Sequence, residues 1–201
     1  MEERSTSFVV HSALDVNIWI LHVPSVDAAR PASCPQCGCA ARVPGAPFGV
    51  VGHGLRQRQV RGPATIDAPP EVRTIATRRY RCRRCDAVVA VVPRGLVPRQ
   101  HFGAGAIALA LFLFGVLGQS AAEAARRAGS WAAGASAWRT VRRWLAAIEQ
   151  RRLFAVVRGA PPSWSPRRCA ARAAMTLASL VPAPFAASDA ARAFAGAALA
   201  S

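Results

Sequence analysis

The sequence contains no lysine, so all 26 of its basic residues are arginine. Acidic residues are also scarce, and the 10 that are present leave a formal net charge of +16 at pH 7. This charge favours an anionic partner, with nucleic acid as the first candidate and an anionic membrane surface as the second. Without lysine the chain has no Gly-x-x-x-x-Gly-Lys phosphate loop, and it also has no Gly-x-Ser-x-Gly nucleophile turn.

Long apolar runs are missing as well. No uninterrupted run reaches the 18 or more residues of a membrane-spanning helix, and the start of the chain does not resemble a secretory signal. The apolar segment 103–118 is too short to cross about 30 Å of hydrocarbon, so we expect it to form a buried helix. A membrane partner is therefore disfavoured, and we expect a cytoplasmic, nucleoid-associated protein.

Composition divides the chain into four segments and predicts an α+β fold. Residues 1–30 contain a β-branched stretch at 16–23 that predicts a strand. Residues 31–100 hold five of the six cysteines, with Gly-Pro turns between candidate strands at 48–60, 71–81 and 87–92. Residues 101–152 show helical patterning, and residues 153–201 form an Ala/Pro-rich tail, helical or disordered, with possible helices at 167–180 and 187–200.

Four cysteines form two Cys-x-x-Cys pairs, Cys34 with Cys37 and Cys82 with Cys85. This spacing lets both thiolates of a pair reach one metal ion from a tight turn, and two such turns supply the four sulfur ligands of tetrahedral zinc. The intervening residues 38–81 have room for two strands, so the pattern predicts a zinc ribbon with a long hairpin. Four thiolates close the coordination sphere, so the predicted Zn²⁺ is structural rather than catalytic.

Other interpretations of the cysteines remain open. The two pairs could be unrelated reduced turns, and Cys39 could replace Cys37 as a ligand. His53 is a weaker ligand candidate because it lies between glycines, and Cys169 is expected to be a free thiol in the tail.

Arginines are concentrated on the second predicted strand of the ribbon and on its Cys-x-x-Cys turn. They form either a solvated charged face or a surface that follows phosphates, since a guanidinium group suits bidentate phosphate contacts. The candidates for DNA contact in this region are Arg78, Arg79, Arg81, Arg83 and Arg84.

Three helices are predicted between 104 and 152. Ser120 and Glu123 form a capping-box pattern at the start of the second helix, and Gly129 ends it. In the third helix, from about 136 to 152, one stripe is apolar, and the other face carries the candidate DNA-contacting residues Arg139, Thr140, Arg142 and Arg143. In a helix-turn-helix such a face enters the major groove, although the link from 129 to 136 is longer than the usual turn. A helical bundle with a charged outer face is the alternative.

Together, the segments 34–38 (CPQCG), 78–85 (RRYRCRRC), 91–93 (VVP) and 136–145 (SAWRTVRRWL) resemble the N-terminal region of bacterial insertion-sequence transposases. Short transposase-like proteins with a zinc ribbon and a helix-turn-helix are similar over about residues 30–150. The resemblance implies zinc at Cys34, Cys37, Cys82 and Cys85 and DNA contacts from the third helix.

The carboxylates of a nuclease domain are missing. After residue 130 only Glu149 and Asp189 are acidic, and two such residues do not make a two-metal site. We therefore expect a non-enzymatic, zinc-stabilised protein that binds double-stranded DNA and takes no small-molecule substrate. A larger transposase or a second copy of the chain is a possible partner, and the alternative functions are a protein-interaction module or a peripheral membrane protein.

Overall fold

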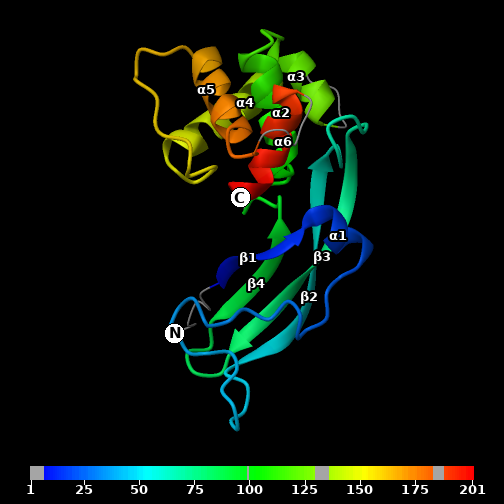
Figure 1. Cartoon of the computed structure of the whole chain (residues 1–201), viewed down its shortest axis with the longest axis vertical. Helices are drawn as coiled ribbons and strands as arrows, with labels where there is room; N and C mark the ends of the chain where they lie inside the picture. Colours follow the sequence, from blue (N-terminus) through cyan, green and yellow to red (C-terminus); the bar gives the residue numbers. More distant parts are fainter. Residues whose placement is uncertain (1–6, 99, 130–135, 183–187) are drawn as a thin grey trace. The chain divides into compact units, whose positions relative to one another are not determined.

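The computed structural model describes residues 7–98, 100–129, 136–182 and 188–201. The chain divides into two compact units (Figure 1). The first comprises 1–59 and 74–94, and the second comprises 60–73 and 95–201. An α+β architecture is thereby confirmed, with a sheet in the N-terminal half and a helical region after it.

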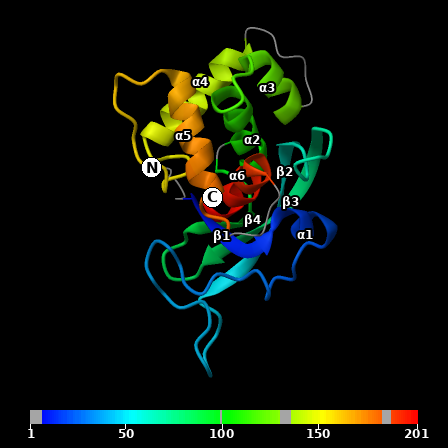
Figure 2. The same ribbon diagram turned by 45° about the horizontal axis from the view of Figure 1, so that its top comes forward.

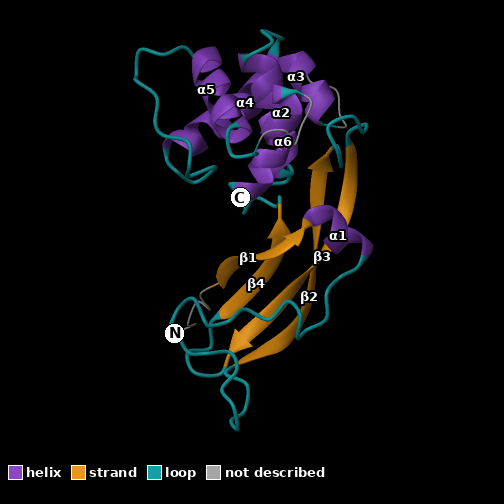
Figure 3. Cartoon of the chain, viewed as in Figure 1, coloured by secondary structure: helices purple, strands orange, loops and turns teal. Residues whose placement is uncertain are grey.

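The first unit contains most of a four-stranded mixed sheet in the order β1-β4-β3-β2 (Figure 3), and residues 60–73, with the end of β2 and the start of β3, are counted in the second unit. Its strands are β1 (Ser7–Asp15), β2 (Val50–Gly62), β3 (Glu71–Cys82) and β4 (Val88–Arg94). β4 pairs with β3 antiparallel and with β1 parallel. The strands predicted at 48–60, 71–81 and 87–92 are confirmed as β2, β3 and β4.

The strand predicted at 16–23 is wrong. β1 ends at Asp15, and the apolar run forms the short helix α1 (Val16–Leu21). The side chain of Asp15 accepts a hydrogen bond from the N–H of Asn17, which satisfies one of the free donors at the helix start. Trp19 of α1 is fully buried and donates its indole N–H to the carbonyl of Ala76 at 2.8 Å. A β-branched run therefore becomes helical because its start is capped and its tryptophan is anchored on β3.

The second unit contains α2 (Ala104–Gly115), α3 (Ala121–Ala128), α4 (Ser136–Glu149), α5 (Pro166–Ala178) and α6 (Asp189–Leu199). α2 contacts the other four helices (Figure 2), and ten of its twelve residues are buried. The buried helix expected from the apolar segment 103–118 is thus confirmed. The capping box of Ser120 and Glu123 is also present at the start of α3.

The Ala-rich tail contains the helices α5 and α6, which pack into the core, while residues 153–165 form a loop. α5 and α6 bury alanines and Leu177 beside α2. Two glycines permit this close approach. A Cβ atom on Gly115 would lie 2.2 Å from the backbone N of Ala171, and one on Gly196 would lie 1.9 Å from the carbonyl O of Leu177. Because these residues are small, the backbones of the helices approach one another closely. The helices therefore bury their facing surfaces without large side chains.

Candidate metal centre and basic surfaces

The two Cys-x-x-Cys turns of the first unit have the same backbone geometry. In one turn the N–H of Gly38 donates to the carbonyl of Cys34 at 2.9 Å, and in the other the N–H of Asp86 donates to that of Cys82 at 3.0 Å. The N–H of Cys34 donates to the carbonyl of Cys39, and that of Cys82 donates in the same way to the carbonyl of Ala87. Two segments far apart in sequence thus form matching knuckles.

Both knuckles close through the same unusual conformation. Gly38 has a φ of 68°, and Asp86, at the equivalent place, has a φ of 63°. Aspartate is among the few residues other than glycine that enter the left-handed region. The carboxylate of Asp86 accepts two hydrogen bonds of 2.6 Å from Arg81, which holds the second knuckle in shape.

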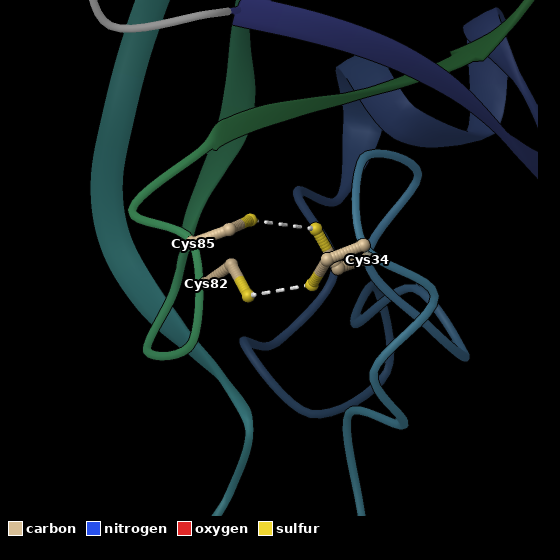
Figure 4. Close-up of side chains that lie close together, drawn as sticks. Cys34, Cys82 and Cys85 are labelled. Atoms are coloured by element: carbon tan, nitrogen blue, oxygen red, sulfur yellow. Dashed lines mark hydrogen bonds between the residues drawn. The ribbon is translucent and has the colours of Figure 1, made fainter. Parts of the chain in front are cut away.

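The knuckles bring four thiols to one point. The Sγ atoms of Cys34, Cys37, Cys82 and Cys85 all lie within 4.8 Å of one another. Cys34 and Cys85 are 3.6 Å apart and Cys37 and Cys82 are 3.7 Å apart, and Figure 4 shows Cys34 facing Cys85 across the centre. A tetrahedron with metal–sulfur bonds of about 2.3 Å has sulfur–sulfur edges of about 3.8 Å. The cluster thus has the size and the donor set of a metal site, which confirms the grouping predicted from the sequence.

Backbone N–H groups point at the thiols and stabilise their ionised form. Burial alone would raise the pKa of Cys82, but hydrogen bonds from the backbone of Cys85, the thiol of Cys39, the backbone of Arg84 and the thiol of Cys85 together outweigh burial and lower it to about 6. The pKa of Cys37 is lowered chiefly by the N–H of Cys39. For Cys85, a hydrogen bond from the backbone of Ala87 lowers the pKa, but burial and the neighbouring thiols raise it to about 12. Four crowded thiols resist complete ionisation, and a bound cation would offset that repulsion.

Cys39 lies beside the cluster. Its Sγ is 3.3 Å from that of Cys82, but it is not among the four cysteines whose sulfurs are all mutually within 4.8 Å. The hydrogen bond to Cys82 is the main reason that the pKa of Cys39 is raised, to about 12. His53, the other ligand candidate, is exposed on β2 and does not belong to that group either.

We predict that Cys39→Ser keeps one bound metal ion per chain, whereas Cys37→Ser loses most of it. Cys37 completes the tetrahedron of sulfurs, and Cys39 touches it from one side only. The measurement is metal content by mass spectrometry after dialysis against a weak chelator. If instead Cys39→Ser is the variant that loses the ion, then Cys39 replaces Cys37 as the ligand.

One glycine that the sequence did not single out positions the first knuckle. A Cβ atom on Gly49 would lie 2.4 Å from the carbonyl O of Ala40, and the N–H of Gly49 donates to Ala41. The carbonyl of Gly49 accepts a hydrogen bond from the N–H of Arg83 in the other knuckle. Gly49 thus joins the two knuckles through backbone contacts that no larger residue would allow.

The five arginines predicted on β3 and its knuckle have different surroundings. Arg78 donates to the carbonyl of Pro24 at 2.8 Å, and Arg81 is paired with Asp86. Arg79 is half-buried, whereas Arg83 and Arg84 are exposed. The knuckle arginines are therefore the members of this set with the freest access to a partner.

α4 has the two faces that the sequence predicts. Val141, Trp144, Ala147 and Ile148 are buried against the helical core. The opposite stripe carries Arg139, Arg142 and Arg143, which are exposed, while Thr140 is half-buried. Most of the long link before α4 (130–135) lies outside the described residues.

None of the helices in the described part of the chain is long and apolar enough to span a bilayer. The comparisons with known proteins return no family model, no curated protein and no solved structure that matches this chain.

Proposed function

We propose that this chain is a zinc-stabilised protein that binds double-stranded DNA and lacks nuclease chemistry. The observation that carries the proposal is the matched pair of knuckles with four sulfurs at tetrahedral spacing, on a chain with a net charge of +16.

Zinc is the metal that this donor set fits best. Four cysteine sulfurs at tetrahedral spacing suit zinc or an iron–sulfur centre, and two knuckles donating N–H groups to the sulfurs are typical of a structural zinc site. With four thiolates the ion would have no open position for substrate or water. The zinc would therefore hold the ribbon together and perform no reaction.

The α4 surface supports DNA as the partner. Arg139, Arg142 and Arg143 lie at helical spacing on one exposed stripe, and a helix with such a stripe fits the major groove. Arg83 and Arg84, exposed on the second knuckle, offer a further set of phosphate contacts. The resemblance to transposase DNA-binding regions supports the same partner, and a larger transposase or a second copy of the chain would be a compatible one.

The double variant Arg142→Ala/Arg143→Ala is predicted to weaken duplex binding without lowering the melting temperature, because both side chains are exposed. If they contact only phosphate, the loss should be equal for all sequences and the salt slope should fall by about 1 per contact. If one of them reads guanine, discrimination at one base pair should fall by about 1–3 kcal/mol. The measurement is an affinity titration at several salt concentrations.

The variant Arg83→Ala/Arg84→Ala removes the same charge from the knuckle and serves as the matched comparison. A larger loss in this variant than in the α4 variant would assign DNA binding to the ribbon. Unchanged affinity in both would reject the proposed DNA interface.

A second prediction concerns catalysis. With supercoiled DNA and Mg²⁺ or Mn²⁺, the purified chain is expected neither to nick nor to join strands, because phosphodiester chemistry of this kind uses a cluster of metal-binding carboxylates. Glu149 and Asp189 lie on different helices, and Asp189 pairs with Arg192. Gel analysis of the plasmid tests the prediction, and metal-dependent cleavage that is lost in a point variant of this chain would contradict it.

A further inference from the structure

A cavity of about 280 Å³ lies in the helical unit between α4, α5 and the loop that joins them. Its apolar wall includes Leu145, Ile148, Val157 and Trp164. The volume is near the lower end of the range for small-molecule sites, and a mostly apolar wall with a few polar groups is typical of them. The sequence predicted no small-molecule site among its lining residues. Arg142 was predicted only as a DNA-contacting residue on α4.

The loop that closes the cavity is anchored at both ends. Leu153, Phe154 and Val157 are buried in the helical core. Pro161 and Pro162 restrict the backbone further along, where the N–H of Trp164 donates to the carbonyl of Pro161 at 3.0 Å. The cavity is therefore preformed, and a ligand would not have to order the loop when it binds.

Charge in the cavity is strongly unbalanced. Arg142, Arg158 and Arg172 contribute to its lining, against a single carboxylate, Glu149. Within the described part of the chain, none of these three guanidinium groups forms an ion pair. Three cationic donors around an apolar hollow fit an anionic group, and a guanidinium group fits the two oxygens of a carboxylate.

Trp164 adds an aromatic surface. The guanidinium group of Arg168 lies 4.0 Å from the centre of its ring, and that of Arg172 lies 5.4 Å away. Because Arg168 lies over a face of this ring, a second ring would pack on the part of Trp164 that the cations leave uncovered, and edge packing on tryptophan is favourable. Glu149 in the same wall favours a ligand with one negative charge over one with two, because it repels each added charge.

We propose that this cavity binds a small aromatic monocarboxylate, with its ring against Trp164 and Ile148 and its carboxylate held by Arg158 and Arg172. This site shares Arg142 with the proposed DNA interface. It does not involve the metal centre, which belongs to the first unit.

The test uses the full-length, metal-loaded chain and two probes, 1-naphthoate and the uncharged 1-naphthamide, measured by isothermal titration calorimetry. Loss of the charged contact should weaken binding of the amide by about tenfold or more. Arg158→Gln/Arg172→Gln should weaken 1-naphthoate by a similar factor, while Arg127→Gln on α3, which lies outside the cavity, should not change it. Equal affinity for the acid and the amide would overturn the proposal.

Cys169 provides a local readout because this residue lines the same cavity. Burial raises the pKa of this thiol, so alkylation by iodoacetamide at mildly alkaline pH should be slow enough to follow by peptide mass spectrometry. Saturating 1-naphthoate should slow modification of Cys169 by about tenfold and leave the other cysteine peptides unchanged. An unchanged rate at Cys169 would show that the probe binds elsewhere and would also overturn the proposal.

A cavity-filling variant gives an independent check. Ala160→Trp should abolish 1-naphthoate binding because Ala160 lines the cavity, whereas Ala155→Trp, on an exposed position of the same loop outside the lining, should retain it. The far-ultraviolet circular dichroism of each variant shows whether it has folded, and the arginine variants decide the question if Ala160→Trp has not. Retained binding in a folded Ala160→Trp chain would contradict the assignment.

Discussion

Cys82→Ser should release the metal and unfold the first unit while the helices of the second unit remain. Zinc contributes an apparent binding free energy of about 10–16 kcal/mol to the folding of zinc-finger peptides, and here it would join two knuckles that are far apart in sequence. Cys82 is fully buried at the end of β3, and it accepts hydrogen bonds from the second knuckle, so its loss affects both the ligand set and the strand. Metal analysis beside near- and far-ultraviolet circular dichroism is the measurement.

The matched control is Cys169→Ser, which changes the same chemical group in the helical unit. It should keep the full metal content and the spectrum of the wild type, because Cys169 is not part of the sulfur cluster. A wild-type chain that is folded after complete removal of its metal would show that the cluster is not needed for the fold.

Trp144→Ala should lower the free energy of unfolding of the helical unit by about 3–5 kcal/mol, the range for removing a buried large aromatic side chain. Trp144 is 3% exposed in the core cluster, and its ring packs edge-on against Phe102 with centroids 5.1 Å apart. The truncation leaves a void that the helices around α2 cannot fill without moving. Urea denaturation followed by circular dichroism measures the loss.

Trp138→Ala, on the same helix, is the control for the loss of a tryptophan. Trp138 is 39% exposed, and its ring is tilted against Phe114 at 5.7 Å, so we expect a loss of about 1 kcal/mol or less. An equal decrease in the free energy of unfolding in the two variants would mean that α4 does not bury the face that carries Trp144.

Local signals predicted much of this fold because they are strong where they occur. The capping box at Ser120 and the apolar stripe of α4 depend on residues within two turns of one another, and the structure reproduces both. The N-terminal segment, with β1 and α1, was harder to predict. The run at 16–23 is as apolar as a strand, and its helical state depends on the cap at Asp15 and on the burial of Trp19 against β3. β1 itself is stabilised by a parallel partner, β4, which lies about 80 residues away in the chain.

The candidate metal site was predictable as a set of residues, but its shape was not. The spacing of the cysteines identifies the ligands, whereas the match between Gly38 and Asp86 depends on backbone angles. The role of Gly49 between the two knuckles depends on its close contact with Ala40, which exists only in the folded chain. The cavity beside α4 was missed for a similar reason: its wall comes from two helices and a proline-rich loop, and no short motif contains them.

Arg142 belongs both to the exposed stripe of α4 and to the wall of the cavity. A carboxylate bound in the cavity reduces the positive potential that Arg142 presents to a phosphate. Under the two proposals, binding of the carboxylate therefore weakens binding of DNA, and binding of DNA weakens binding of the carboxylate. Thermodynamic linkage then requires reciprocity: 1-naphthoate must weaken DNA binding by the same factor by which DNA weakens 1-naphthoate binding. Measuring both ratios on the wild type and on Arg142→Ala would show whether this side chain couples the two sites, in which case the antagonism disappears in the variant.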